Sequence, residues 1–143
     1  MISLSVDASQ FAAVTAVLEK HKQIPVEHIL DEAGAALLNR NRERFLAKKN
    51  PDNVPWIPSD AGMLREMAGG PGTLFDTGKL FDSIQLHSDG PNDRSISSAV
   101  DYDKYLVSSP KPDKRWPFLG FNDNDSMIFK DIVVRRVNEA LQD

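Results

Sequence analysis

The sequence contains no cysteine, which excludes disulfide bonds, zinc–thiolate sites and thiol catalysis. Aromatic residues make up only 8% of the chain, and no apolar run approaches the roughly 20 residues that a membrane-spanning helix needs. Residues 1–7 lack the basic start and long apolar run of a secretory signal peptide. We therefore expect a protein of the reducing cytoplasm that has no membrane partner and is not exported by this signal route.

Histidines and catalytic motifs are also scarce. The three histidines, His21, His28 and His87, form no closely spaced pair. His28 is followed at helical spacing by Asp31 and Glu32, an arrangement that would place metal ligands on one helix face. A surface histidine on a charged helix explains the same pattern more simply, and no histidine accompanies a nucleophile elbow. We therefore expect no metal site and no catalytic residue.

Two acidic pairs and one glycine-rich segment are the remaining candidates for chemistry. Asp123 and Asp125 precede an apolar helical pattern, where capping and the helix dipole are sufficient to explain them. Asp101 and Asp103 flank a tyrosine near a predicted strand end. The segment 69–72 lacks the lysine and the helix-opening context of a phosphate-binding loop. A hydrolase of unrecognised type stays an alternative, but we expect a non-enzymatic protein without a cofactor.

Length and composition fit a single globular domain. The chain has 143 residues, of which 41% are apolar and 27% are charged. Its net charge of −4 disfavours nucleic acid as a general partner. A local basic cluster is the exception: Arg40, Arg42, Arg44, Lys48 and Lys49. A solvated helix end explains this cluster, and the alternative is a small nucleic-acid-binding module that contacts phosphates rather than bases.

Hydrophobic periodicity predicts several helices. Apolar residues recur at helical spacing over 8–22, over 25–48 and more briefly over 60–68. A last helix follows Asp123 and Asp125, one of which is expected to cap it. The longest of these helices, 25–48, ends in the basic cluster.

Alternating patterns predict a small sheet. Ile2, Leu4 and Val6 alternate with polar residues, which favours a short strand. Two alternating segments surround the turn-forming residues 89–93, so 84–100 is expected to form a β-hairpin. The expected fold class is α+β, with long N-terminal helices packed on a small antiparallel sheet and a C-terminal helix that closes the core.

Three segments, in this order, carry a resemblance to a known family. Residues 44–58 end in NPDNVPWIP, which resembles a helix end followed by Pro-Asp-Gly-x-x-Trp-x-Pro. Residues 74–84, LFDTGKLFDSI, resemble Leu-x-x-Thr-Gly-x-Leu-x-x-Ser-Ile. Residues 115–121, RWPFLGF, resemble an Arg-x-Phe-Leu-Gly segment that precedes a last helix. With these segments the chain is similar to the virion morphogenesis and tail-completion proteins of tailed phages, the family that includes the Mu-like examples.

The resemblance implies one tail-completion or neck-type domain over 1–143 that assembles as a ring, often hexameric, at the head–tail junction. The implied partners are copies of itself, the tail tube protein and head-side connector proteins, with DNA in the channel as a further candidate. The implied location is the virion neck, reached from the host cytoplasm. Loops 49–59, 69–75 and 107–117 are the candidate contact segments. The structural anchors are expected to be Trp56, Pro58, Gly78, Leu80, Phe118, Leu119 and Gly120. The candidate interaction residues are Arg40, Arg42, Arg44, Lys48, Lys49, Lys111, Lys114 and Arg115.

Overall fold

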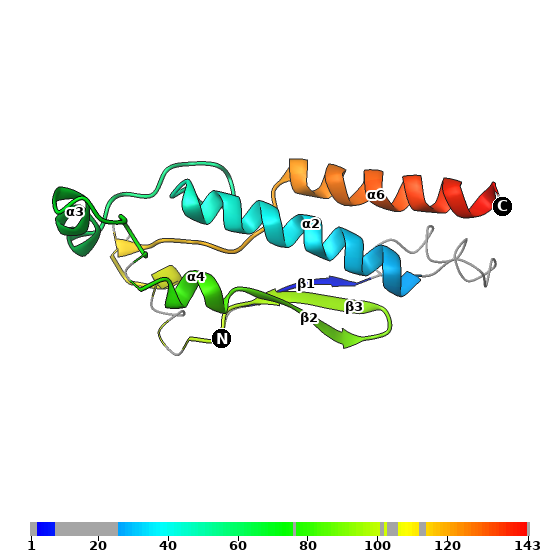
Figure 1. The fold of residues 1–143 in the computed structure, drawn as a ribbon, viewed down its shortest axis with the longest axis horizontal. Helices are drawn as coiled ribbons and strands as arrows, with labels where there is room; N and C mark the ends of the chain where they lie inside the picture. The colour runs from blue at the N-terminus through cyan, green and yellow to red at the C-terminus, as the bar shows by residue number, and fades with distance from the viewer. Residues whose placement is uncertain are drawn as a thin grey trace.

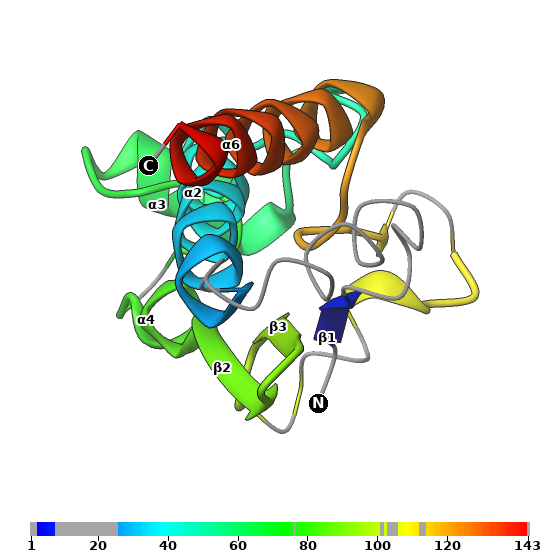
Figure 2. The same ribbon diagram turned by 90° about the vertical axis from the view of Figure 1, so that its right-hand side faces the viewer.

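The computed structural model describes residues 3–7, 26–75, 77–100, 102, 106–111 and 114–142 of the chain. Figure 1 shows an elongated molecule in which a small sheet, the long helix α2 (Val26–Leu46) and the C-terminal helix α6 (Asp123–Leu141) lie one above another. The end-on view in Figure 2 shows α2 between the sheet and α6. The α+β architecture predicted from the sequence is confirmed. None of the helices described is long and apolar enough to cross a membrane.

The sheet is antiparallel and has the strand order β1-β3-β2. Strand β1 (Ser3–Asp7) confirms the strand predicted at the start of the chain, and β2 (Gln85–Gly90) with β3 (Asp93–Ser97) confirms the hairpin. A bulge between Ser88 and Gly90 shifts the register where β2 approaches the turn. Strand β3 lies between the other two strands, and its residues are more consistently buried than those of β2.

Helix α2 supplies the centre of the core. Its apolar residues recur every three or four positions, and Ile29, Leu30, Ala33 and Leu37 are all almost fully buried. At Gly34 the helix backbone comes so near the sheet that a Cβ atom would lie 2.9 Å from the side chain of Leu86. The predicted helix 25–48 is therefore confirmed almost to its ends, whereas the helix predicted over 8–22 lies outside the described residues.

Ion pairs tie α6 to the start of α2. Glu32 pairs with both Arg135 and Arg136, and its oxygen is 3.2 Å from the Arg136 Nε. The hydrogen bond and the negative charge from Glu32 raise the pKa of Arg135. These contacts run along the seam that Phe129 and Val133 of α6 fill from the buried side.

Two short helices lie towards one end of the molecule (Figure 1). Helix α3 (Asp60–Met67) confirms the helix predicted over 60–68 and is capped by Ser59, whose side chain accepts from the Gly62 amide. Helix α4 (Lys79–Ser83) was not among the helices predicted from the sequence. Gly78 has a left-handed conformation with φ of 83° and caps a helical turn before the strand begins.

Candidate functional site

A buried ion-pair centre joins the end of α2 to the start of α6. The Asp125 carboxylate is fully buried and accepts from Arg40 Nε and Arg44 NH1, each at 2.7 Å. Arg44 is itself buried and also donates to the Gly120 carbonyl oxygen at 2.7 Å. Charged groups that are withdrawn from water need such pairing, so this centre is a structural determinant of the helix packing.

The same centre corrects the predicted cap of the last helix. The N-cap is Asn122 rather than Asp123 or Asp125. The Asn122 side chain accepts from the Asp125 amide at 2.8 Å, and the Asp125 carboxylate accepts from the Asn122 amide at 3.2 Å. Asp125 therefore takes part in the capping box from the N3 position while it also holds the two arginines.

The three segments that carry the family resemblance meet around one side chain, Phe45. Its ring centroid is 5.4 Å from that of Trp56 in the first segment, 5.5 Å from Phe81 in the second and 6.1 Å from Phe118 in the third. The Trp56 and Phe118 rings meet Phe45 edge-on, an arrangement that aromatic pairs favour. The segments therefore share a packing role, although they are far apart in the sequence.

Two tryptophans fasten the loops around this cluster to each other. The Trp56 indole donates to the Pro117 carbonyl at 2.8 Å, and the Trp116 indole donates to the Ile57 carbonyl at 2.7 Å. The two bonds run in opposite directions between loops about 60 residues apart in the sequence. They fix the point at which the chain leaves the core towards α3.

Most of the predicted structural anchors are buried. Trp56, Leu80 and Phe118 belong to the core, Gly78 is buried with its positive φ, and Leu119 is half-buried against the core. Gly120 has no room for a side chain, because a Cβ atom would lie 2.4 Å from the Pro51 ring, and its amide donates to Asn41. Pro58 is the exception: it is exposed, so the expectation that it anchors the loop is wrong.

The basic cluster of α2 does not form one exposed surface. Arg40 and Arg44 are engaged with Asp125, so Arg44 is a core residue and its expected role in partner contact is wrong. Arg42 donates to the Ile84 carbonyl at 2.7 Å. Lys48 and Lys49 are half-buried in the turn after the helix.

The three basic candidates of loop 107–117 lie nearer the surface. Lys111 and Arg115 are exposed, and the Arg115 guanidinium donates to the Ser109 carbonyl at 2.5 Å. Lys114 pairs with Asp60 of α3 at 3.4 Å. Loop 107–117 therefore borders the α3 end of the molecule.

Residues 57–73, which we call the arm, form an extension that includes α3 and lies at the α3 end of the molecule (Figure 1). The Thr73 hydroxyl accepts from the Ser59 amide at 3.0 Å, so the two ends of the arm are bonded together. Gly62 sits so tightly on Thr73 that a Cβ atom would lie 2.7 Å from its backbone. Arg65 donates to the Gly72 carbonyl at 2.9 Å. An isolated helix this short is unstable in water, so these bonds hold the arm in shape.

The arm directs its large apolar side chains away from the core. Met67 is 84% exposed and Leu64 is 67% exposed, and Met63 and Ile57 are also largely exposed. Single exposed apolar residues are common, but a group of them on one small, well-held element makes the arm a candidate interaction surface. The sequence pattern predicted this helix but gave no sign that its apolar residues face outwards.

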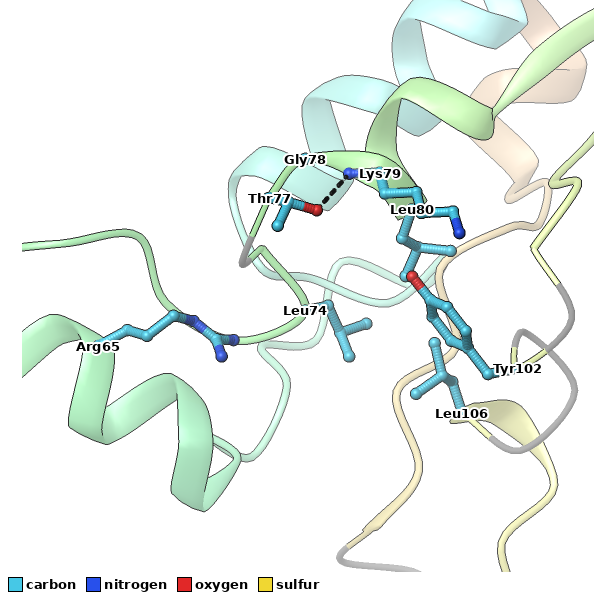
Figure 3. Close-up of a pocket in the computed structure, with 8 residues that line it drawn as sticks. All are labelled: Arg65, Leu74, Thr77, Gly78, Lys79, Leu80, Tyr102 and Leu106. Atoms are coloured by element: carbon cyan, nitrogen blue, oxygen red, sulfur yellow. Dashed lines mark hydrogen bonds between the residues drawn. The ribbon is translucent and has the colours of Figure 1, made fainter.

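A pocket of about 200 Å³ lies between the arm and α4 (Figure 3). Arg65 of the arm and Lys79 at the start of α4 are its charged lining residues. Leu74, Leu80 and Leu106 form its apolar part, beside Tyr102, Thr77 and Gly78. Within the described ranges neither Arg65 nor Lys79 is part of an ion pair, and the Arg65 Nε atom is buried without a hydrogen-bond partner. The pocket therefore combines two basic side chains with an apolar floor.

Sequence reasoning singled out neither Arg65 nor Lys79, because each is an isolated basic residue in its segment.

No group of three or more acidic or histidine side chains in the described part of the chain could hold a metal ion. No family model matches the chain, and neither a curated protein nor a solved structure matches it.

Proposed function

We propose that this chain is a structural virion protein of a tailed phage, which assembles as a ring at the head–tail junction. It completes the tail or joins the tail to the head, and it acts by binding rather than by catalysis. Its proposed partners are other copies of the chain, the tail tube protein and the head-side connector proteins, and its proposed location is the virion neck. The family resemblance of the three segments motivates this proposal.

The arm is the observation that supports the proposal best. Its apolar residues Met63, Leu64 and Met67 are exposed, although its backbone is bonded in place through Ser59 and Thr73. A surface that is ordered before it binds loses little conformational entropy on binding, which favours a stable contact. An exposed apolar element held in this way suits a subunit that becomes buried only in an assembly.

The meeting of the three segments around Phe45 adds support of a different kind. If the resemblance reflects a shared fold, its residues should be those that the fold needs. Phe45, Trp56, Phe81 and Phe118 pack together, and Gly120 accepts from Arg44 beside them. This arrangement suits a family whose members share a framework and function through its surfaces.

Electron microscopy of the purified protein tests the proposal directly. The protein is imaged alone, with tailless heads and with headless tails of a matching phage. Rings, or density added at the tail end or at the portal, are the expected result. A Met67→Ser variant should lose this density, and Met127→Ser on the outer face of α6, where Met127 is 60% exposed, provides a matched control. Wild-type protein that adds no density to either particle and forms no ring would contradict the proposal.

A further inference from the structure

The two ends of the long axis differ in shape and in charge. The arm and its basic pocket lie towards one end, and the turn of the β2–β3 hairpin points to the other, as Figure 1 shows from the side and Figure 2 from the hairpin end. The hairpin end carries Asp89 next to the turn residues Pro91 and Asn92, all of them exposed. The pocket at one end is therefore lined by basic residues, and the hairpin turn, which points the other way, carries an exposed acidic residue.

The hairpin tip is held rigidly from within. Arg94 is buried and donates through NH1 to the Gly90 and Asp93 carbonyls, each at 2.8 Å. Its Nε donates to the Asp31 carboxylate of α2 at 2.6 Å, which ties the tip to the long helix. A tip fixed in this way needs little further ordering when it enters a binding site.

The pocket matches such a tip in size and in charge. A volume of about 200 Å³ accepts one or two side chains but not a helix. Arg65 and Lys79 are the charged groups that line it, and the described part of the chain places no carboxylate in the lining. Asp89 is exposed and forms no ion pair with another described residue, and its charge is opposite to that of the two basic lining residues.

We propose that the β2–β3 turn of one copy seats in the arm pocket of a second copy, with the Asp89 carboxylate against the Lys79 side chain. Complementary charges steer such partners together and fix their register. The contact uses a different surface on each copy, so it repeats head to tail, and a head-to-tail contact either closes into a ring or continues as a filament. The inference rests on the proposed assembly and names the two surfaces that would build it.

Cysteine cross-linking tests the contact, because the native chain has no cysteine to interfere. A full-length Asn92→Cys variant is mixed under oxidising conditions with a differently tagged Thr77→Cys variant, which places one thiol at the turn and the other at the pocket. The control pairs Asn92→Cys with Ser126→Cys, an exposed position at the start of α6. The turn–pocket heterodimer should exceed the control heterodimer on the order of tenfold, because the contact raises the local thiol concentration.

Charge reversal then separates a specific contact from chance collision. Adding Lys79→Glu to the pocket variant should lower the heterodimer yield on the order of tenfold, and adding Asp89→Lys to the turn variant should restore it. Both positions are exposed, so circular dichroism should show an unchanged fold. A yield no greater than that of the control, both in free protein and in protein bound to tails, overturns the contact.

The same experiment distinguishes this inference from the proposed function. Rings in micrographs without the turn–pocket cross-link would leave the neck function standing and overturn only the contact. A charge-dependent cross-link in protein that forms filaments and binds neither heads nor tails would support the contact and contradict the neck function.

Discussion

Replacing Asp125 with asparagine should be one of the most damaging single changes in this protein. The substitution keeps the size of the side chain and leaves a polar group for the capping box, but it removes the negative charge between Arg40 and Arg44. Arg44 is left as a buried cation whose acceptors are neutral, the Gly120 carbonyl and the amide oxygen of the new asparagine. Breaking a buried pair in this way costs about 3 kcal/mol or more, a large part of the roughly 5–15 kcal/mol that stabilises a typical domain.

Urea unfolding measures this loss. With a slope of about 2 kcal/mol per molar urea, the midpoint should fall by about 1.5 M. Asp123→Asn is the matched control, because Asp123 lies in the same helical turn but is exposed, and it should cost about 0.5 kcal/mol through the helix dipole. An Arg44→Met, Asp125→Asn double variant should lose less than the sum of the two single variants. Equal midpoints for Asp125→Asn and Asp123→Asn would refute the reasoning, since they would mean that water solvates the centre.

Three further predictions concern the surface and the loops. Met67→Ser should change the free energy of unfolding by no more than about 0.5 kcal/mol, because the side chain is 84% exposed; a larger loss in urea unfolding would mean that the arm is part of the core. Trp56→Phe should cost about 2 kcal/mol and Trp116→Phe about 1 kcal/mol, since both variants lose an indole hydrogen bond but only Trp56 is buried. A larger loss for Trp116→Phe than for Trp56→Phe in thermal unfolding would contradict this ranking. Any binding to DNA should show a log–log salt slope no steeper than about −2, as expected if only Lys48 and Lys49 of the basic cluster reach phosphates, whereas a slope near −4.5 would revive the nucleic-acid-binding alternative.

The helices were largely predictable because their periodicity is local. The patterns over 25–48 and 60–68 identified α2 and α3 within a residue or two at each end. Helix α4 was missed because its five residues are too few to show a helical period. The cap of α6 was misplaced by one to three residues because aspartate and asparagine are equally good caps, and the segment 122–125 offers several of them.

The roles of individual side chains were less predictable. Arg40, Arg42 and Arg44 look alike in the sequence, and the partner that buries Arg44 is 81 positions away. The exposure of the apolar residues of α3 was equally unpredictable from the sequence. Periodicity indicates that a helix has an apolar face, but it does not reveal whether the rest of the chain covers that face. Burial depends on tertiary contacts, and a pattern of nearest neighbours carries no information about them.

The contacts that stabilise the molecule are separate from the surfaces that it exposes at its ends. Phe45 and Asp125 gather the long-range contacts where α2 meets α6 and the loops. The arm and the hairpin tip are held by separate sets of hydrogen bonds, which involve Thr73 and Arg65 in the arm and Arg94 at the tip. Substitutions at exposed positions of either end should therefore leave the chain folded while altering the proposed assembly, because surface substitutions away from such contacts change stability little. A chain built in this way can present ordered surfaces before any partner is bound, which suits the stepwise assembly that we propose.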